Sequence, residues 1–162
     1  MRIKQVFTLV VSLFLVAGCG SDNSSGVFIS TGGVTVTKDL KSAPAVTFTK
    51  DAGARIGLLV EDVVVGSGAE VLPTSTVTAH YTGLGMSSRK KFDSSWDRGQ
   101  PATFPLAQVI QGWQKGLPGM KVGGRRLLII PGNLGYGQIP PQGSGIQPNE
   151  TLVFVVDLTA VN

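Results

Sequence analysis

The chain has 162 residues, which is enough for one ordinary domain with additional segments. It contains one Cys and one His, so an intramolecular disulfide framework and a zinc site of Cys and His ligands are both excluded. Charged residues make up 15% of the chain, which is not the composition of a disordered polyelectrolyte. The formal net charge of +4 has the sign that nucleic-acid binding favours, so its meaning depends on where the charges lie.

The N-terminal residues have the pattern of a secretory signal. A short basic start precedes a largely apolar run over residues 6–17, which is too short to cross a bilayer core of about 30 Å. The run ends in Val-Ala-Gly-Cys at residues 16–19, which resembles the bacterial lipobox, where the cysteine is lipidated and becomes the mature N-terminus. We therefore expect lipidation at Cys19, and two acyl chains there would hold the protein stably at a membrane. The alternative is a plain signal peptide that is cut near Gly18 or Gly20.

This leader changes the meaning of the net charge. Removing residues 1–18 takes away Arg2 and Lys4 and no acidic residue, so the mature chain is nearly neutral and a nucleic-acid partner is not expected. We predict a lipoprotein signal peptide over 1–18 and a flexible Gly/Ser-rich tether over 19–33. An N-terminal β extension with the first domain strand follows over 34–73, and the main domain occupies 74–162.

Short runs that alternate apolar and polar residues dominate the mature chain and predict strands. The expected strands lie at 34–39, 46–51, 58–65, 76–82, 90–93, 125–130 and 151–161.

One helix is predicted over 109–117, where Gly112 and Gly116 each cost about 1 kcal/mol relative to Ala, so the helix needs packing against a sheet. The loop over 135–148 is rich in Gly and Pro and is a candidate flap. The fold class is therefore α+β, an antiparallel sheet of about five strands with one short helix. The pair Arg125-Arg126 is interpreted as a solvated strand end.

The usual signatures of enzymes with acid–base, phosphate or metal chemistry are missing from the sequence. The Gly-rich stretch 119–124 lacks the Gly-Lys-Ser/Thr ending of a phosphate-binding loop, and no Gly-x-Ser-x-Gly elbow occurs. Acidic residues are scattered, so we expect no metal and no cofactor. What remains is a set of aromatic residues after position 80, interspersed with glycines, which suits either an ordinary core or an apolar cup.

Five segments carry a more specific resemblance. In chain order they are Ala79-His80-Tyr81-Thr82-Gly83, Lys91-Phe92-Asp93-Ser94-Ser95, Val109-Ile110-Gln111-Gly112-Trp113, Gly135-Tyr136-Gly137 and Thr151-Leu152-Val153-Phe154. Over residues 58–162 the chain resembles the FKBP-type peptidyl-prolyl cis/trans isomerases. The resemblance implies a twisted antiparallel sheet wrapped around one short helix, and rotamase activity on X-Pro bonds.

The resemblance also implies a site. Trp113 would form the floor of an apolar pocket, and its walls would be Tyr81, Phe92, Phe104, Val109, Ile110, Tyr136 and Phe154. The backbone N–H of Ile110 and the hydroxyl of Tyr136 would donate hydrogen bonds to a substrate. Asp93 would be the pocket carboxylate, held by Tyr81 and Arg98. Ile146 is a candidate flap contact.

Two departures from the family pattern bear on specificity rather than on the catalytic core. Ala102 stands where many members carry an aromatic residue, so one wall of the pocket is expected to be thinner. The stretch over 104–109 is about two residues shorter than in well-known eukaryotic members.

The expected function is a prolyl isomerase that assists protein folding at the bacterial cell envelope, lipid-anchored through Cys19. Gly20, rather than Asp, after the cysteine favours the outer membrane in a Gram-negative cell. The alternative is a non-catalytic peptide-binding or chaperone module that uses the same pocket. Expected partners are proline-containing polypeptides and FKBP-type macrolides, and the protein is expected to be a monomer. The role of residues 27–57 stays open.

Overall fold

The structure is a computed structural model that describes residues 28–162. The predicted signal peptide, Cys19 and most of the predicted tether lie outside the described residues. The larger sheet has six strands in the order β4-β8-β9-β5-β6, with β7 also paired to β5, and every pair is antiparallel. The strands are β4 Leu59–Val64, β5 Thr76–Gly85, β6 Lys91–Ser94, β7 Ala102–Pro105, β8 Arg125–Ile130 and β9 Leu152–Val161.

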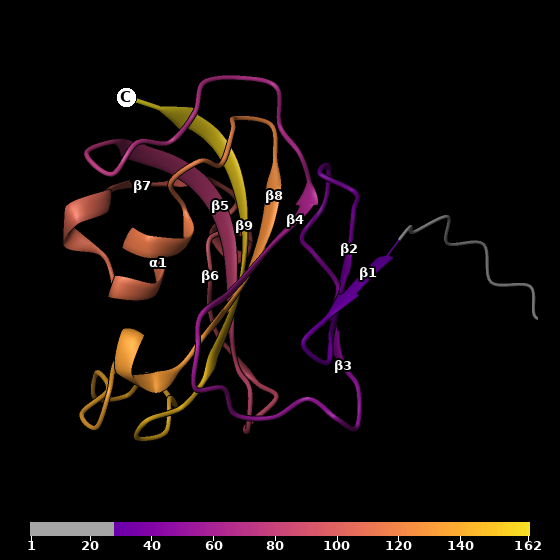
Figure 1. Cartoon of the computed structure of the whole chain (residues 1–162), viewed down its shortest axis with the longest axis vertical. Coiled ribbons are helices and arrows are strands. Elements are labelled where there is room, and N and C mark those ends of the chain that lie inside the picture. Colours follow the sequence, from indigo (N-terminus) through magenta and orange to yellow (C-terminus); the bar gives the residue numbers. More distant parts are fainter. Residues whose placement is uncertain (1–27) are drawn as a thin grey trace, which may run out of the picture.

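The sheet is twisted, and the one α-helix among the described residues packs against one of its faces (Figure 1). The predicted α+β architecture, an antiparallel sheet with one short helix, is therefore confirmed. The long strands β5 and β9 lie side by side at the centre and pair from Val77 opposite Val161 to Gly85 opposite Leu152, with a shift of register between Thr78 and Ala79. As the alternation predicts, Val77, Ala79 and Tyr81 are buried on one face of β5, where they join the core beneath the helix.

The helix α1 spans Gln111–Gly116 and is shorter than the predicted 109–117. Ile110 caps it with an extended backbone (φ −58°, ψ 149°), so Val109 and Ile110 precede the helix instead of starting it. The two glycines are explained by close packing on β8. A Cβ at Gly112 would lie 2.6 Å from Ile130 Cδ1, and one at Gly116 would lie 2.7 Å from Leu128 Cδ2. Gly therefore lets the helix approach the sheet more closely than Ala would allow.

Strand β7 was not expected from the sequence. It pairs with β5 along the edge of the sheet, and its last residue is Pro105. Proline is accepted at an edge because it has no backbone N–H to donate to a further strand. The prolines at 101 and 105 interrupt the local strand pattern, so only the pairing with β5 reveals the strand. Within residues 28–162 there are also three short 3₁₀ helices, at Trp96–Arg98 (η1), Leu106–Gln108 (η2) and Gly132–Leu134 (η3).

A second, three-stranded antiparallel sheet is formed by β1 Phe28–Thr31, β2 Val34–Thr37 and β3 Val46–Phe48. The last part of the segment that was predicted to be a flexible tether, 19–33, is therefore strand and turn. The turn between β1 and β2 is Gly32-Gly33, with φ of 61° and 80°. A two-residue hairpin of this kind needs positive φ at both positions, which Gly adopts without strain. Residues 28–53 are called the extension below.

The extension packs against the face of the large sheet that is opposite α1 (Figure 1). Val34 and Val36 from the extension join a mainly aliphatic cluster with Val63, Ile129 and Val153. Strand β8 is consequently buried at every position, because the sheet is covered on both sides.

The prediction that Arg125 and Arg126 are solvated is wrong. Arg125 is 0% exposed, pairs with Asp157, and donates to the carbonyl oxygens of Thr37 (2.9 Å) and Ser42 (3.0 Å) of the extension. Arg126 is also buried and pairs with Asp62 on β4. The two arginines are compatible with burial because each has a carboxylate partner and further acceptors.

Candidate functional site

The predicted aromatic residues gather around one open cavity of about 310 Å³ on the α1 side of the sheet. Its volume lies within the range of small-molecule binding sites. The residues that line it are Tyr81, Phe92, Asp93, Phe104, Gln108, Val109, Ile110, Trp113, Tyr136 and Phe154.

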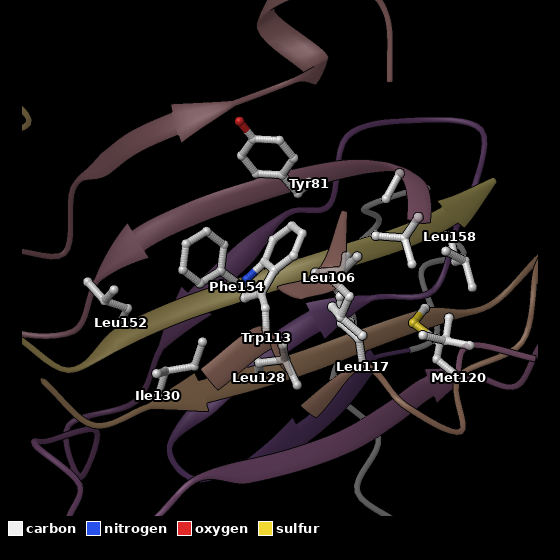
Figure 2. Close-up of a cluster of buried hydrophobic side chains, with 14 of the residues drawn as sticks. Tyr81, Leu106, Trp113, Leu117, Met120, Leu128, Ile130, Leu152, Phe154 and Leu158 are labelled. Atoms are coloured by element: carbon white, nitrogen blue, oxygen red, sulfur yellow. The ribbon is translucent and has the colours of Figure 1, made fainter. Parts of the chain in front are cut away.

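Trp113 forms the floor of this pocket. Its indole makes edge-to-face contacts with three rings, with centroid distances of 5.6 Å to Tyr81, 5.6 Å to Phe104 and 5.4 Å to Phe154. Figure 2 shows the indole beside Phe154 and Tyr81, with the Tyr81 hydroxyl pointing away from the labelled core side chains. Because Trp113 is only 4% exposed and fixed on three sides, the floor is rigid.

The sheet supplies the walls through the alternation of neighbouring strands. Tyr81 on β5 and Phe154 on β9 point to the α1 side, and Phe92 on β6 contacts Phe154 edge-to-face at 5.5 Å. Gly83 makes this contact possible, since a Cβ there would lie 2.7 Å from Phe92 and 2.8 Å from Phe154. Position 83 therefore requires glycine, because any larger side chain would collide with the rings of Phe92 and Phe154.

A polar group of three side chains lies at one side of the pocket. The Tyr81 hydroxyl donates to Asp93 Oδ2, and Arg98 donates from Nη1 to Asp93 Oδ1 (2.6 Å) and from Nη2 to the Tyr81 oxygen (2.8 Å). Asp93 is therefore held by two donors and the Tyr81 ring cannot rotate freely. Arg98 does not line the cavity, but it fixes two residues that do.

The pKa values of the pocket groups are all displaced away from neutrality. Burial acts to raise the pKa of Asp93, but the hydrogen bonds from Tyr81 and Arg98 outweigh it and lower the pKa. Burial, followed by the hydrogen bond with Asp93, raises the pKa of Tyr81. Burial and the charge of Asp93 raise the pKa of Tyr136. At neutral pH the pocket thus contains one carboxylate and two protonated phenols.

Three donors at the pocket have no acceptor among the residues that the structure describes. They are the backbone N–H of Ile110, which precedes α1, the hydroxyl of Tyr136, and the indole N–H of Trp113. The Trp113 donor is buried, and a buried donor without a partner is rare and marks a place where a ligand or water binds. The Tyr136 and Ile110 donors belong to residues that line the open cavity. The pocket can therefore receive an apolar group on its walls and a carbonyl oxygen at its donors.

Most residues that the sequence assigned to the site are brought together by the structure. Arg98 touches the site through Asp93 and Tyr81, as described above. Ile146 is 8% exposed within the core cluster beneath α1 and does not line the cavity. Ala102 is partly buried beside the same cluster and does not line the cavity, so the expected thinner wall stays a prediction. Gln108 lines the pocket and was not expected. The only signal for it was its position beside the Val109-Ile110 segment.

Metal ligation has no support in residues 28–162. Within this range no group of three or more His, Cys, Asp or Glu side chains is placed to hold an ion.

Comparison with known proteins agrees with this geometry. A family model described as FKBP-type peptidyl-prolyl cis-trans isomerase matches residues 68–159. The chain is 52% identical over 102 residues to a probable FK506-binding protein of Corynebacterium glutamicum, covering 62% of this chain and 84% of that protein. It is 40% identical over 119 residues to the FKBP-type peptidyl-prolyl cis-trans isomerase FkpA of Escherichia coli K12, covering 70% of this chain and 42% of FkpA.

Solved structures show the same relationship. The crystal structure of Escherichia coli FkpA matches with a TM-score of 0.61 at 39% identity, covering 70% of this chain and 52% of that chain. A peptidyl-prolyl cis-trans isomerase of Pseudomonas syringae pv. tomato matches with a TM-score of 0.59 at 32% identity, covering 67% of this chain and 78% of that chain. Together with the aromatic pocket, its unpaired donors and the family match over residues 68–159, these likenesses show that the chain belongs to the FKBP-type peptidyl-prolyl cis-trans isomerases.

Proposed function

We propose that this isomerase acts on X-Pro bonds of exported polypeptides at the bacterial cell envelope, where a lipid on Cys19 anchors it. The observation that carries the location is the single cysteine of the chain, Cys19, which follows the apolar run over residues 6–17 after one glycine. No helix of the described part of the chain is long and apolar enough to cross a membrane. Two acyl chains on Cys19 would supply the stable attachment that the proposal requires. In a Gram-negative cell, Gly20 after the cysteine favours the outer membrane.

The pocket accounts for catalysis without acid–base chemistry. Rotation about an X-Pro bond is slow because amide resonance imposes a barrier of about 18–20 kcal/mol. The twisted transition state has lost that resonance, so its carbonyl carries less charge than the planar amide. The apolar walls around Trp113 disfavour the more polar planar form, and this difference lowers the barrier.

The donors add a second contribution. The N–H of Ile110 and the Tyr136 hydroxyl are free to receive substrate carbonyl oxygens, and their rigid placement favours the geometry in which both are met. The raised pKa of Tyr136 keeps its hydroxyl a donor throughout the neutral range. No proton is transferred, so the pH dependence of catalysis should not follow these groups near neutrality.

The same pocket is proposed to bind FK506-type macrolides, since the Corynebacterium relative is described as an FK506-binding protein. We further propose that the protein works as a monomer, because the pocket is built from one chain.

The activity is tested by exchange NMR on a capped peptide with one Ala-Pro bond. Isomerisation should be accelerated by the protein and the acceleration should be abolished by FK506. Peptide binding without acceleration of isomerisation would contradict the enzyme assignment and favour the non-catalytic peptide-binding or chaperone module.

The location is tested separately by expressing the full chain and its Cys19→Ala variant in a bacterial host. The wild type should fractionate with membranes and carry a diacylglyceryl group by mass spectrometry of its N-terminal peptide. Cys19→Ala should be released with unchanged isomerase activity. Equal fractionation of both proteins, or an unmodified Cys19, would overturn the anchor and leave the activity intact.

A further inference from the structure

His80 lies on the face of β5 opposite Tyr81, and the mechanism does not use it. Its ring stacks on Trp96, with centroids 4.0 Å apart and planes 17° apart. Its Nδ1 atom lies 3.0 Å from Ser95 Oγ. The single histidine is thus held by two consecutive residues at the start of η1.

Ser95 connects His80 to the backbone of the pocket residue Tyr81. The Tyr81 N–H donates to Ser95 Oγ at 2.8 Å, and the Ser95 N–H donates to the Tyr81 carbonyl at 3.1 Å. Ser95 is fully buried, so these bonds are not exchanged with water. The serine therefore fixes the backbone of β5 at the position from which the Tyr81 ring enters the pocket.

Ser95 is also the N-cap residue of η1, the short helix that carries Arg98. The Arg98 N–H donates to the Ser95 carbonyl at 3.1 Å, and the guanidinium reaches across to Asp93 and Tyr81. A displacement of Ser95 would therefore move both the Tyr81 backbone and the origin of the Arg98 side chain.

We propose that His80 is a positioning residue for the isomerase pocket, acting through Ser95 and η1 on Tyr81 and Arg98. The inference rests on the isomerase activity assigned above. It predicts that the charge of His80, on the opposite face of the sheet, affects a reaction that has no acid–base step.

The hydrogen bonds of Ser95 give the physical reason. The Ser95 hydroxyl can donate to His80 Nδ1 at 3.0 Å or to the Tyr81 carbonyl at 3.5 Å, and the longer distance is at the limit of a hydrogen bond. Neutral His80 with its proton on Nε2 is therefore the good acceptor. A proton on Nδ1 would reverse this bond and send the serine hydrogen to the distant carbonyl.

The charged surroundings of His80 are few. Asp157 lies directly opposite it on β9, and Arg125 of β8 is paired with Asp157. His80 also lines an open cavity of about 300 Å³, together with Trp96, Leu40 of the extension and residues of β9, so solvent can deliver a proton to the ring. The pKa of Asp93 is lowered and the pKa values of Tyr81 and Tyr136 are raised, so these pocket groups keep their charge states between about pH 5 and 8.

The test measures kcat/KM by exchange NMR on a capped peptide without ionisable groups, from pH 5 to 8. The wild type should lose activity several-fold towards the acid end, in step with the ¹⁵N chemical shift of His80 Nδ1. His80→Asn places an uncharged acceptor near the Nδ1 position and should give near wild-type activity with a flat profile. His80→Phe keeps the ring on Trp96 but removes the acceptor, and it should be several-fold less active at every pH.

These results distinguish positioning from simple stability. Thermal unfolding of each variant is followed by circular dichroism, and activity is measured only where the variant is folded; if His80→Phe does not fold, His80→Asn carries the test. An active wild type with a flat profile, or a His80→Asn variant that keeps the wild-type pH dependence, would overturn the inference. Lack of activity in the wild type at all pH values would instead overturn the isomerase assignment.

Discussion

The two faces of the large sheet carry cores of different kinds. Towards α1 the core is aromatic, and it opens into a cavity in which Trp113, Tyr136 and the Ile110 N–H keep donors without partners among the described residues. Towards the extension the core is mainly aliphatic, and its buried Arg125 has a carboxylate and two carbonyl oxygens as partners. One sheet thus separates an aromatic core that opens into the pocket from a mainly aliphatic core that buries a fully paired arginine.

The difference shows how the domain reconciles binding with stability. Unpaired donors and an open apolar surface are unfavourable in a folded protein, but a ligand needs both. The extension compensates by burying the opposite face of β8 and β9, which adds apolar contacts without touching the pocket. Residues 28–53 are therefore an integral layer of the described structure. Substitutions on the α1 face should therefore alter ligand binding, whereas substitutions on the face that meets the extension should alter stability alone.

The largest effect is expected for Trp113→Ala, because it removes the pocket floor. Macrolide affinity should fall by well over tenfold, and the free energy of unfolding should fall by about 3–5 kcal/mol. Titration calorimetry with FK506 and urea denaturation measure the two effects.

The matched control on the other face is Ile129→Ala, which lies in the aliphatic core. Its loss of stability should be about 2–5 kcal/mol, with FK506 affinity and kcat/KM unchanged where the protein is folded. An equal loss of affinity in both variants would mean that the faces are not separable.

Arg125→Met should be the next most severe change, and it should affect stability alone. It leaves Asp157 buried without its partner and removes the donor to the extension, which should cost about 3–5 kcal/mol in urea denaturation. Replacing both partners, Arg125→Met with Asp157→Leu, should recover much of this loss. A double variant as unstable as Arg125→Met would contradict the buried pair as the cause.

Gly112→Ala probes the contact between α1 and the sheet. The added Cβ would meet Ile130 Cδ1 at 2.6 Å, so overpacking of about 1–3 kcal/mol opposes the gain of about 1 kcal/mol in helix propensity. We expect lower kcat/KM, because the helix carries Trp113 and follows Ile110. Gly57→Ala is the control, since nothing lies within 4 Å of its added Cβ. Comparable activity losses in the two variants would rule out the helix contact.

The smallest effect concerns Asp93 and pH. Tyr81 and Arg98 lower the pKa of Asp93 in the folded protein. The contribution of Asp93 to stability is therefore complete above its pKa in the unfolded chain, and it is lost as the pH falls through its pKa in the folded protein. The difference in melting temperature between wild type and Asp93→Asn should be constant from neutrality to about pH 5 and shrink below about pH 4. It should amount to a few degrees, since Asp93 and Arg98 are roughly half exposed. A difference that grows towards acid pH would contradict the lowered pKa.

The candidate site was predictable for those residues that lie within short recognisable segments of the sequence. Tyr81, Phe92 and Trp113 belong to segments with recognisable order and spacing, and the structure brings them together. Gln108 was missed because only the turn of η2 directs it to the cavity. Ile146 was assigned to the flap contact, but the loop folds it into the core beneath α1.

The fold was predictable where local periodicity decides it. The alternation over 76–82 and 151–161 identifies β5 and β9, because every second side chain meets the same core. Strand β7 was not predictable from the sequence, since it is recognised only by its pairing with β5, which lies about 25 residues earlier in the chain.

By itself the sequence predicted most strands of the large sheet and the order of the pocket segments, because these are properties of neighbouring residues. The same kind of local pattern predicts the leader over 1–18 that precedes Cys19. It did not determine what covers the second face of the sheet. Alternation shows which residues share a face, but only tertiary packing shows what that face meets. For that reason Arg125 was expected in solvent and lies buried against the extension, and only the folded chain places His80 against Ser95. The single histidine thus acquires its meaning from contacts between distant segments.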